Sequence, residues 1–195
     1  THPVQYYDPF FKLLATKGVE LKVFYTWGEQ SINKYDPGFK RIIKWDLPLL
    51  DGYYFEFLEN KASDPGSHHF RGIQNIDAIL KIRSFAPDAI LVFGWCYQSH
   101  LAIIRHFKSR IPVWFRGDST LLDNQNGLKK RIRLHLLKWI YSHVDKAFYV
   151  GSNNKDYFRA CGLREDQLVF SPHAVDNARF SIDSSEEAMV LRQRL

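Results

Sequence analysis

The second half of this chain alternates apolar runs with amphipathic segments, and that alternation restricts the folds it can adopt. Residues Ala89–Phe93 form an unbroken apolar run, as expected of a strand covered on both faces, and Gly94 follows it. Helices and strands are then predicted in strict alternation, at Gln98–Arg110, Ile111–Phe115, Leu128–Val144, Lys146–Val150, Asn153–Cys161 and Gln167–Phe170. This order predicts an α/β fold with a Rossmann-like, doubly wound parallel sheet.

The first half of the chain is less regular. A helix is predicted over Asp8–Lys17, a strand over Glu20–Thr26 and a further helix over Gln74–Phe85. The aromatic and proline-rich stretch between them contains two possible short strands, Arg41–Trp45 and Tyr53–Leu58.

The chain length allows one main domain. A chain of 195 residues can bury one sizeable core, and we expect residues 1–180 to form it. An α/β domain that opens in a loop lacks the strand that is usually central to the sheet, so we expect a first strand to be missing ahead of Thr1. Residues 181–195 are polar and are expected to be a linker toward an absent C-terminal domain.

Composition places the chain among ordinary globular proteins. Hydrophobic residues make up 45% and charged residues 25%, and no apolar run approaches the roughly 18 residues of a membrane span. Cys96 and Cys161 are far apart and lack metal-type spacing, so we expect reduced, partly buried thiols in a cytoplasmic protein, with a disulfide or catalytic thiol as the alternative. No bound metal is expected.

The net charge of +6 favours contact with anions such as phosphates, anionic lipid or nucleic acid. A basic cluster on a predicted amphipathic helix consists of Lys129, Lys130, Arg131, Arg133 and Lys138. A solvated helix face is the simplest interpretation, and peripheral attachment to an anionic membrane is the functional one. Nucleic acid is disfavoured, because the basic residues are not interleaved with stacking aromatics.

The loop after the strand Ile111–Phe115 carries the most reactive residues. In a doubly wound sheet, ligands bind beyond the carboxyl ends of the strands, where Arg116, Asp118 and Ser119 are predicted to lie. Asp118 is suited to activating a hydroxyl or binding a sugar, and Arg116 to pairing with a phosphate. Helix capping by Asp118 or Ser119, or an ion pair between Arg116 and Asp118, is the structural alternative.

Other loops at the same edge supply further candidates. His2 and Gln5 lie in the opening loop, where His2 could act as a base or contact a ligand, or could equally be a surface histidine. Trp95 could pack on a sugar ring or belong to the core, and Ser152 could contact a ligand or cap a helix.

Several common sites are not indicated by the sequence. His68 and His69 occupy a polar loop with no carboxylate or cysteine at ligand spacing, so they are expected to have no role. Neither a Walker phosphate loop nor a Gly-x-Gly-x-x-Gly motif occurs, which argues against an ATP-dependent or dinucleotide-dependent enzyme.

Motifs in a characteristic order resemble a known enzyme family. They are the opening Thr-His-Pro-Val-Gln, the run Pro87–Trp95, the segment Ile111–Ser119, the turn Val150–Ser152 and a hinge of the form Pro-x-x-Val-Asp-x-x-x-Phe at 172–180. With these motifs the chain resembles the N-terminal domain of family-4 glycosyltransferases, which are retaining, nucleotide-sugar-dependent enzymes of the GT-B fold. The resemblance covers nearly the whole chain.

The resemblance implies two Rossmann-like domains that face a cleft. The N-terminal domain would bind mainly the sugar, glycolipid or other acceptor, and the C-terminal domain would bind most of the nucleotide-sugar. Many members have a histidine near the reacting sugar at the position of the Arg116–Ser119 turn, and this sequence has none there. The family generally needs no metal, and the nucleotide-sugar is a co-substrate.

Two functions from different classes are therefore compatible with the sequence. The first is the acceptor-side domain of a glycosyltransferase, with little activity on its own. The second is a non-catalytic α/β ligand-binding or sensing module that uses the same loops.

Overall fold

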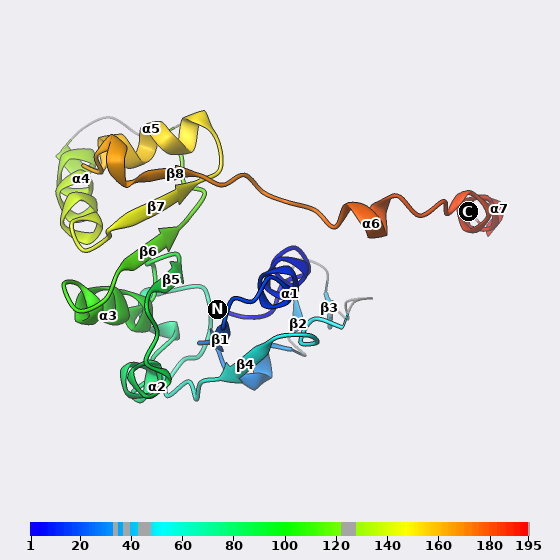
Figure 1. Cartoon of the computed structure of the whole chain (residues 1–195), viewed down its shortest axis with the longest axis horizontal. Helices are drawn as coiled ribbons and strands as arrows, with labels where there is room; N and C mark the ends of the chain where they lie inside the picture. Colours follow the sequence, from blue (N-terminus) through cyan, green and yellow to red (C-terminus); the bar gives the residue numbers. More distant parts are fainter. Residues whose placement is uncertain (33–34, 37–39, 43–47, 122–127, 195) are drawn as a thin grey trace.

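The computed structural model describes residues 1–32, 35–36, 40–42, 48–121 and 128–194, and a parallel sheet forms its centre (Figure 1). Four strands pair in the order β5-β6-β7-β8, and all three pairings are parallel. Their bounds are Ile90–Phe93, Val113–Arg116, Lys146–Tyr149 and Leu168–Phe170. The crossover helices between them are α3 (Gln98–Phe107), α4 (Leu128–Tyr141) and α5 (Ser152–Ala160). The chain therefore has the α/β, Rossmann-like fold that its alternating pattern predicts.

The first half forms a second parallel pair. Helix α1 spans Asp8–Thr16, and β1 (Lys22–Tyr25) pairs in parallel with β4 (Tyr54–Phe57). The remaining elements are the short antiparallel pair of β2 (Tyr35–Asp36) and β3 (Arg41–Ile42), helix α2 (Ala78–Phe85), and the 3-10 turns η1 (Glu29–Ser31), η2 (Phe70–Gly72) and η3 (Glu165–Gln167). The rest of the strand predicted over Arg41–Trp45 lies outside the described residues.

Helices cover both faces of the sheet. Ile90 and Val92 of β5 are buried in the larger apolar cluster, which includes residues of α2, α3, α4 and α5. Phe93 of the same strand packs instead against a smaller cluster, in which its ring lies 6.1 Å from that of Phe11 in α1. Successive side chains of a strand point to opposite faces, so the two clusters lie on opposite sides of β5.

Helix α2 begins at Ala78 and not at Gln74 as predicted. The backbone N–H of Gln74 donates to Asn60 Oδ1 at 2.9 Å, and that of Asn75 donates to Ser99 Oγ at 2.6 Å. The Asn75 side chain also donates to the Thr26 carbonyl at 2.9 Å. These tertiary hydrogen bonds hold the residues of this segment in the loop, although the buried Oδ1 of Asn75 has no hydrogen-bond partner.

Helix α4 turns a different face to the core than its sequence suggests. The repeat of Ile132, Leu136 and Ile140 predicts one buried stripe, but Ile132 is 63% exposed and Leu136 is 48% exposed. The buried stripe instead runs through Leu137, Ile140 and Tyr141. The helix carries two apolar stripes, and contact with the sheet selects one of them.

The cysteines also differ from expectation in one respect. Both thiols are free, but only Cys161 is buried, whereas Cys96 is exposed and not partly buried as predicted. Burial raises the pKa of Cys161 to about 11, so this thiol stays protonated and unreactive.

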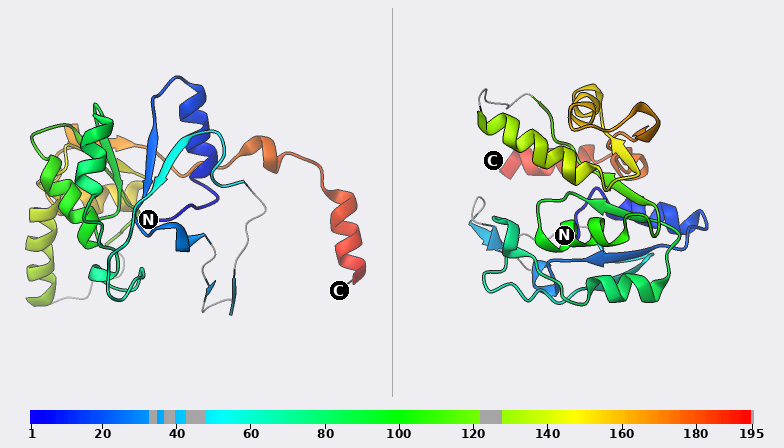
Figure 2. Two further views of the ribbon diagram at one scale, coloured as in Figure 1. Left: turned by 90° about the horizontal axis from the view of Figure 1, so that it is seen from below. Right: turned by 90° about the vertical axis from the view of Figure 1, so that its left-hand side faces the viewer.

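The C-terminal residues contain two helices, and the second of them, α7, lies where a linker is predicted. Helix α6 spans Asn177–Phe180 and is capped by Asp176, whose side chain accepts the N–H of Arg179 at 3.2 Å. Helix α7 spans Ser185–Arg194 and lies well away from the sheet (Figure 1; Figure 2, left). Among the described residues, no helix combines the length and the apolarity needed to cross a membrane.

Candidate functional site

The loops that follow the parallel strands meet at one edge of the sheet, which we call the carboxyl rim. Gly94 follows β5, Arg116 ends β6, Gly151 follows β7 and Ser171 follows β8. Hydrogen bonds link these ends, since Gly94 N–H donates to the Arg116 carbonyl at 3.0 Å and Ser171 N–H donates to the Tyr149 carbonyl at 2.8 Å. The predicted site residues of the central loops therefore come together at one edge.

Arg116 holds the segment that follows β8, which begins with Ser171 and Pro172 and which we call the exit segment. Its side chain is 8% exposed, and Nη1 donates to the Ser171 carbonyl at 2.8 Å and to Ser171 Oγ at 2.9 Å. Nη2 donates to the Pro172 carbonyl at 3.3 Å, whereas the buried Nε has no hydrogen-bond partner. Most of the guanidinium is thus committed to the exit segment, and one buried donor is left for another acceptor. Binding of a substrate phosphate by Arg116 stays a prediction.

The other polar residues of the turn after β6 face solvent. Asp118 and Ser119 are both exposed, as is Ser152 on the neighbouring turn. The side chain of Asn154 joins the two turns, because Nδ2 donates to the Ser119 carbonyl at 2.8 Å and Oδ1 accepts the N–H of Val150 at 3.0 Å. Asn154 is only 1% exposed. The sequence places Asn154 in a predicted helix and gives it no role, and its role follows from a contact between the turns after β6 and β7.

Aromatic side chains from the opening loop line the same rim. The ring of Tyr6 lies 6.3 Å from that of His173, and the ring of Tyr7 lies 6.0 Å from the Arg116 guanidinium carbon. Burial raises the pKa of Tyr6, and the nearby side chains of Tyr7 and Asp118 raise it further. Tyr6, Tyr7 and His173 were not singled out from the sequence, although their position beside strand ends was a signal for them.

The remaining predicted contacts lie toward β1 and the core. His2 is half-buried, with its ring edge-on to Trp27 at 5.4 Å, and Gln5 is half-buried in the same loop. Trp95 is half-buried and packs against the larger apolar cluster. The structural alternative for Trp95 is therefore realised, and its packing on a sugar ring stays a prediction.

His100 is a buried histidine that the sequence reasoning missed. Its Nε2 lies 2.8 Å from Thr26 Oγ1, and its Nδ1 lies 3.1 Å from the Gly94 carbonyl oxygen. A carbonyl can only accept, so Nδ1 carries the proton and Nε2 accepts from the threonine hydroxyl. Burial, together with the nearby amine of Thr1, lowers the pKa of His100 to about 3. His100 thus joins the end of β1 to the end of β5 in its neutral form.

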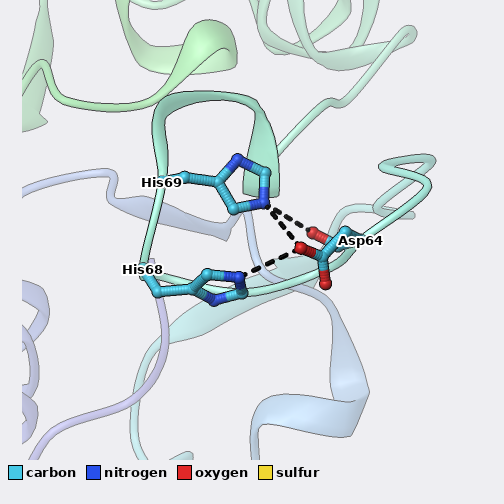
Figure 3. Close-up of side chains that lie close together, drawn as sticks. All are labelled: Asp64, His68 and His69. Carbon is cyan, nitrogen blue, oxygen red and sulfur yellow. Dashed lines mark hydrogen bonds and ion pairs between the residues drawn. The ribbon is translucent and has the colours of Figure 1, made fainter.

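A carboxylate does lie beside His68 and His69, contrary to the sequence analysis. Both Nε2 atoms are directed at Asp64 Oδ2, at 3.1 Å for His68 and 3.2 Å for His69 (Figure 3). The ligand atoms of all three residues lie within 4.8 Å of one another, and two imidazoles with one carboxylate are a ligand set suited to zinc. Hydrogen bonding from His68 holds the pKa of Asp64 below its usual range. The same contacts are ordinary for a carboxylate between two histidines, so they assign no metal.

The loop that carries this cluster is closed by backbone hydrogen bonds. The N–H of Gly66 donates to the Gly72 carbonyl at 3.0 Å, and Asn60 Nδ2 donates to the same carbonyl at 2.8 Å. A Cβ atom added at Gly72 would lie 2.1 Å from the Gly66 carbonyl oxygen, so only glycine allows this close approach.

The basic helix presents a mixed surface. Arg131, Arg133 and Lys138 are exposed on α4, and the exposed apolar side chains of Ile132, Leu136 and Trp139 lie among them. Lys129 and Lys130 belong to the first turn of this helix, but their side chains lie outside the described set. The surface is therefore more apolar than a simple solvated face.

Comparison with known proteins gives no match for this chain. No protein-family model, curated protein or solved structure matches it. Rossmann-like sheets host many unrelated functions, so the fold alone assigns none. Any functional assignment must rest on the chemistry of the carboxyl rim.

Proposed function

We propose that the chain is the acceptor-side domain of a retaining, nucleotide-sugar-dependent glycosyltransferase of the GT-B type. The observation that carries this proposal is the convergence at the carboxyl rim of an exposed carboxylate, Asp118, with the phenol of Tyr6 and the imidazole of His173. A hydroxyl-bearing acceptor needs hydrogen-bond partners and aromatic surfaces of this kind.

The chemistry divides between the two halves of such an enzyme. In sugar transfer the acceptor oxygen bonds to the anomeric carbon of the donor, and the bond from that carbon to the phosphate oxygen breaks. The nucleoside diphosphate leaves, and the hydroxyl proton passes to a base or to the leaving phosphate. We assign Asp118 to holding the acceptor hydroxyl, and Arg116 to an acceptor or phosphate oxygen. Neither a metal nor another cofactor enters this scheme.

Replacement of Asp118 tests the proposal. We expect the protein expressed from its complete coding sequence to release a nucleoside diphosphate from one member of a nucleotide-sugar panel when an acceptor is present. We expect Asp118→Asn to slow that release by about 10²-fold to 10⁴-fold, the usual contribution of a group that takes or holds a proton. The measurement is a coupled assay for the released diphosphate, and we expect little turnover from the 195-residue chain alone.

Asp88→Asn is the matched control, because Asp88 is exposed ahead of β5, at the opposite end of the strand from the rim. Equal rates in the two variants would show that Asp118 is not part of the site. They would not contradict the transferase proposal itself. Binding of sugars or nucleotides without any transfer would instead favour the non-catalytic binding module.

The proposed setting is the cytoplasm, at the inner face of a membrane. Exposed Ile132, Leu136 and Trp139 on α4 support this setting, because an apolar stripe flanked by arginine and lysine is typical of helices that lie in a membrane interface. A glycolipid acceptor would be reached from such a position.

Loss of basic charge from α4 tests the membrane contact. We expect the triple variant Arg131→Gln, Arg133→Gln and Lys138→Gln to bind vesicles with anionic lipid on the order of 100-fold more weakly, since each of the three basic residues contributes about 1 kcal/mol there. Vesicle co-sedimentation measures the change. The control removes the same charge elsewhere on the exposed surface, through Lys17→Gln, Arg71→Gln and Arg83→Gln. Binding that does not depend on anionic lipid would contradict this setting.

A further inference from the structure

The loop of residues 60–74 between β4 and α2, which we call the histidine loop, is tied together at its base by one asparagine. Asn60 Oδ1 accepts the N–H of Ala62 at 3.1 Å and the N–H of Gln74 at 2.9 Å. Asn60 Nδ2 donates to the Gly72 carbonyl at 2.8 Å. Both ends of the loop are thus fixed by the protein's own hydrogen bonds, which lowers the entropic cost of binding a ligand at its tip.

A glycine and a backbone hydrogen bond orient the two histidines of this loop. A Cβ atom added at Gly66 would lie 2.4 Å from Nδ1 of His68, so only glycine leaves room for the His68 ring in this position. The N–H of Gly72 donates to the His69 carbonyl at 3.1 Å, which fixes the backbone that carries the second ring. The ring centroids lie 4.6 Å apart, and both rings are directed at Asp64 (Figure 3).

The three ligand atoms of the cluster have the spacing of a tetrahedral metal site. Both Nε2 atoms approach the same oxygen, Asp64 Oδ2, at 3.1 Å from His68 and 3.2 Å from His69. A zinc ion about 2.0–2.1 Å from each of its ligands holds them roughly 3.3 Å apart in tetrahedral geometry. The ion pairs alone do not distinguish a metal site from a carboxylate between two histidines. The convergence of both rings on one oxygen, in a loop that is already closed, favours the metal site.

We propose that Asp64, His68 and His69 bind one zinc ion through Oδ2 and the two Nε2 atoms, with the fourth position open to water. Imidazole nitrogen and carboxylate oxygen are ordinary zinc ligands, whereas Mg²⁺ and Ca²⁺ prefer oxygen ligands alone. The side chains of Asp64 and His68 are 70% and 62% exposed, so the ion can enter from solvent. The proposal does not depend on the function proposed above.

Zinc binding requires each histidine ring to change its tautomer. A carboxylate oxygen can only accept a hydrogen bond, so in the metal-free protein Nε2 of His68 and Nε2 of His69 carry the protons directed at Asp64. The Nε2 lone pair is the ligand when zinc is bound, so the proton of each neutral ring has to lie on Nδ1. The bonds formed are two from zinc to nitrogen and one from zinc to oxygen, and each ring keeps one proton throughout.

The histidine loop also contacts the loop that follows β5. The hydroxyl of Tyr97 donates to the Ser67 carbonyl, which lies between two of the ligand residues in the chain, at 3.3 Å. A bound zinc ion would therefore restrain the β5 end of the carboxyl rim without entering the transfer chemistry.

Zinc titration of the 195-residue chain tests the proposal. We expect competition with a chromogenic chelator to show one bound zinc ion per chain, and magnesium chloride not to compete. We expect Asp64→Asn and His69→Gln each to weaken zinc binding by about 100-fold or more, since loss of a partner outside the ligand shell already costs about 10-fold to 100-fold. His135→Gln is the matched control, because His135 is an exposed histidine on α4, and it should leave the affinity unchanged.

Nitrogen-15 NMR of the imidazole rings gives a second readout that a merely structural role would not move. We expect zinc to transfer the ring proton from Nε2 to Nδ1 in both His68 and His69 of the parent chain.

The same zinc affinity in Asp64→Asn, His69→Gln and the parent would overturn the proposal. A loss of affinity in His135→Gln or in Cys96→Ser, but not in Asp64→Asn, would also overturn it, because the ion would then be held elsewhere. One zinc ion per two chains would contradict it as well, since the ion would then bridge two copies. Rings that keep their protons on Nε2 in saturating zinc would exclude His68 and His69 as ligands.

Discussion

Replacement of Phe158 by alanine is expected to lower the free energy of unfolding by about 3–5 kcal/mol, the usual cost of removing a buried aromatic ring. Phe158 lies in α5 and is 0% exposed. Its ring packs edge to face against Phe115 of β6 at 6.0 Å and against Tyr141 of α4 at 5.5 Å. The substitution therefore opens a cavity between two helices and the sheet, which the rigid neighbours cannot fill.

Urea unfolding followed by fluorescence and circular dichroism measures this loss. Phe170→Ala is the matched control, because Phe170 has the same side chain in β8 but is 60% exposed. We expect the control to lose about 1 kcal/mol or less. Similar losses in the two variants would show that Phe158 does not fill the core in the way described.

Acidification is the second large perturbation, and it acts through His100. The pKa of this buried imidazole is about 3 in the folded protein, against an ordinary value of 6.5. Between these values the unfolded chain binds a proton that the folded protein does not, so stability falls as the pH falls through this window. The expected contribution of His100 is a loss of about 2 kcal/mol from pH 7.5 to pH 5, rising to about 4 kcal/mol near pH 3.5.

His100→Asn isolates this contribution. The asparagine amide can donate to the Gly94 carbonyl as Nδ1 does, but it does not titrate. We expect the variant to be less stable at pH 7.5, yet to lose about 2 kcal/mol less than the parent on acidification to pH 5. The Thr1 amine, whose pKa is lowered to about 6, and the adjacent ring of Tyr97 are present in both proteins. An identical pH dependence of the two would contradict a buried neutral His100.

Most strands and helices, though not the short strand β2, could be predicted from the sequence because their signals are local. The apolar run at Ile90–Phe93 is the same in the chain and in the structure, and Gly94 ends it with φ +73. Ile103, Ile104 and Phe107 form the buried face of α3 that their spacing predicts. The start of α2 could not be predicted in this way, since hydrogen bonds from distant loops hold the residues ahead of it.

The position of the candidate site was predictable, and its internal contacts were not. Parallel strands bring their following loops to one edge, so Asp118 and Ser152 could be placed at the rim from the order of elements alone. Arg116 and Ser171 are 55 residues apart in the chain, and only the folded sheet brings them within hydrogen-bond distance. The same holds for Asn154 and the Ser119 carbonyl.

The sequence by itself determined the α/β class, the order of its strands and helices, and the edge at which a ligand would bind, because each depends on a repeat or a turn within a few residues. Only the tertiary structure decided which stripe of α4 is buried, and which polar groups are committed to each other. It also decided that the described parallel strands form two sheets, β1 with β4 and β5 with β6, β7 and β8. These outcomes depend on apolar surfaces and hydrogen-bond donors that are far apart in the chain, so no local sequence pattern predicts them.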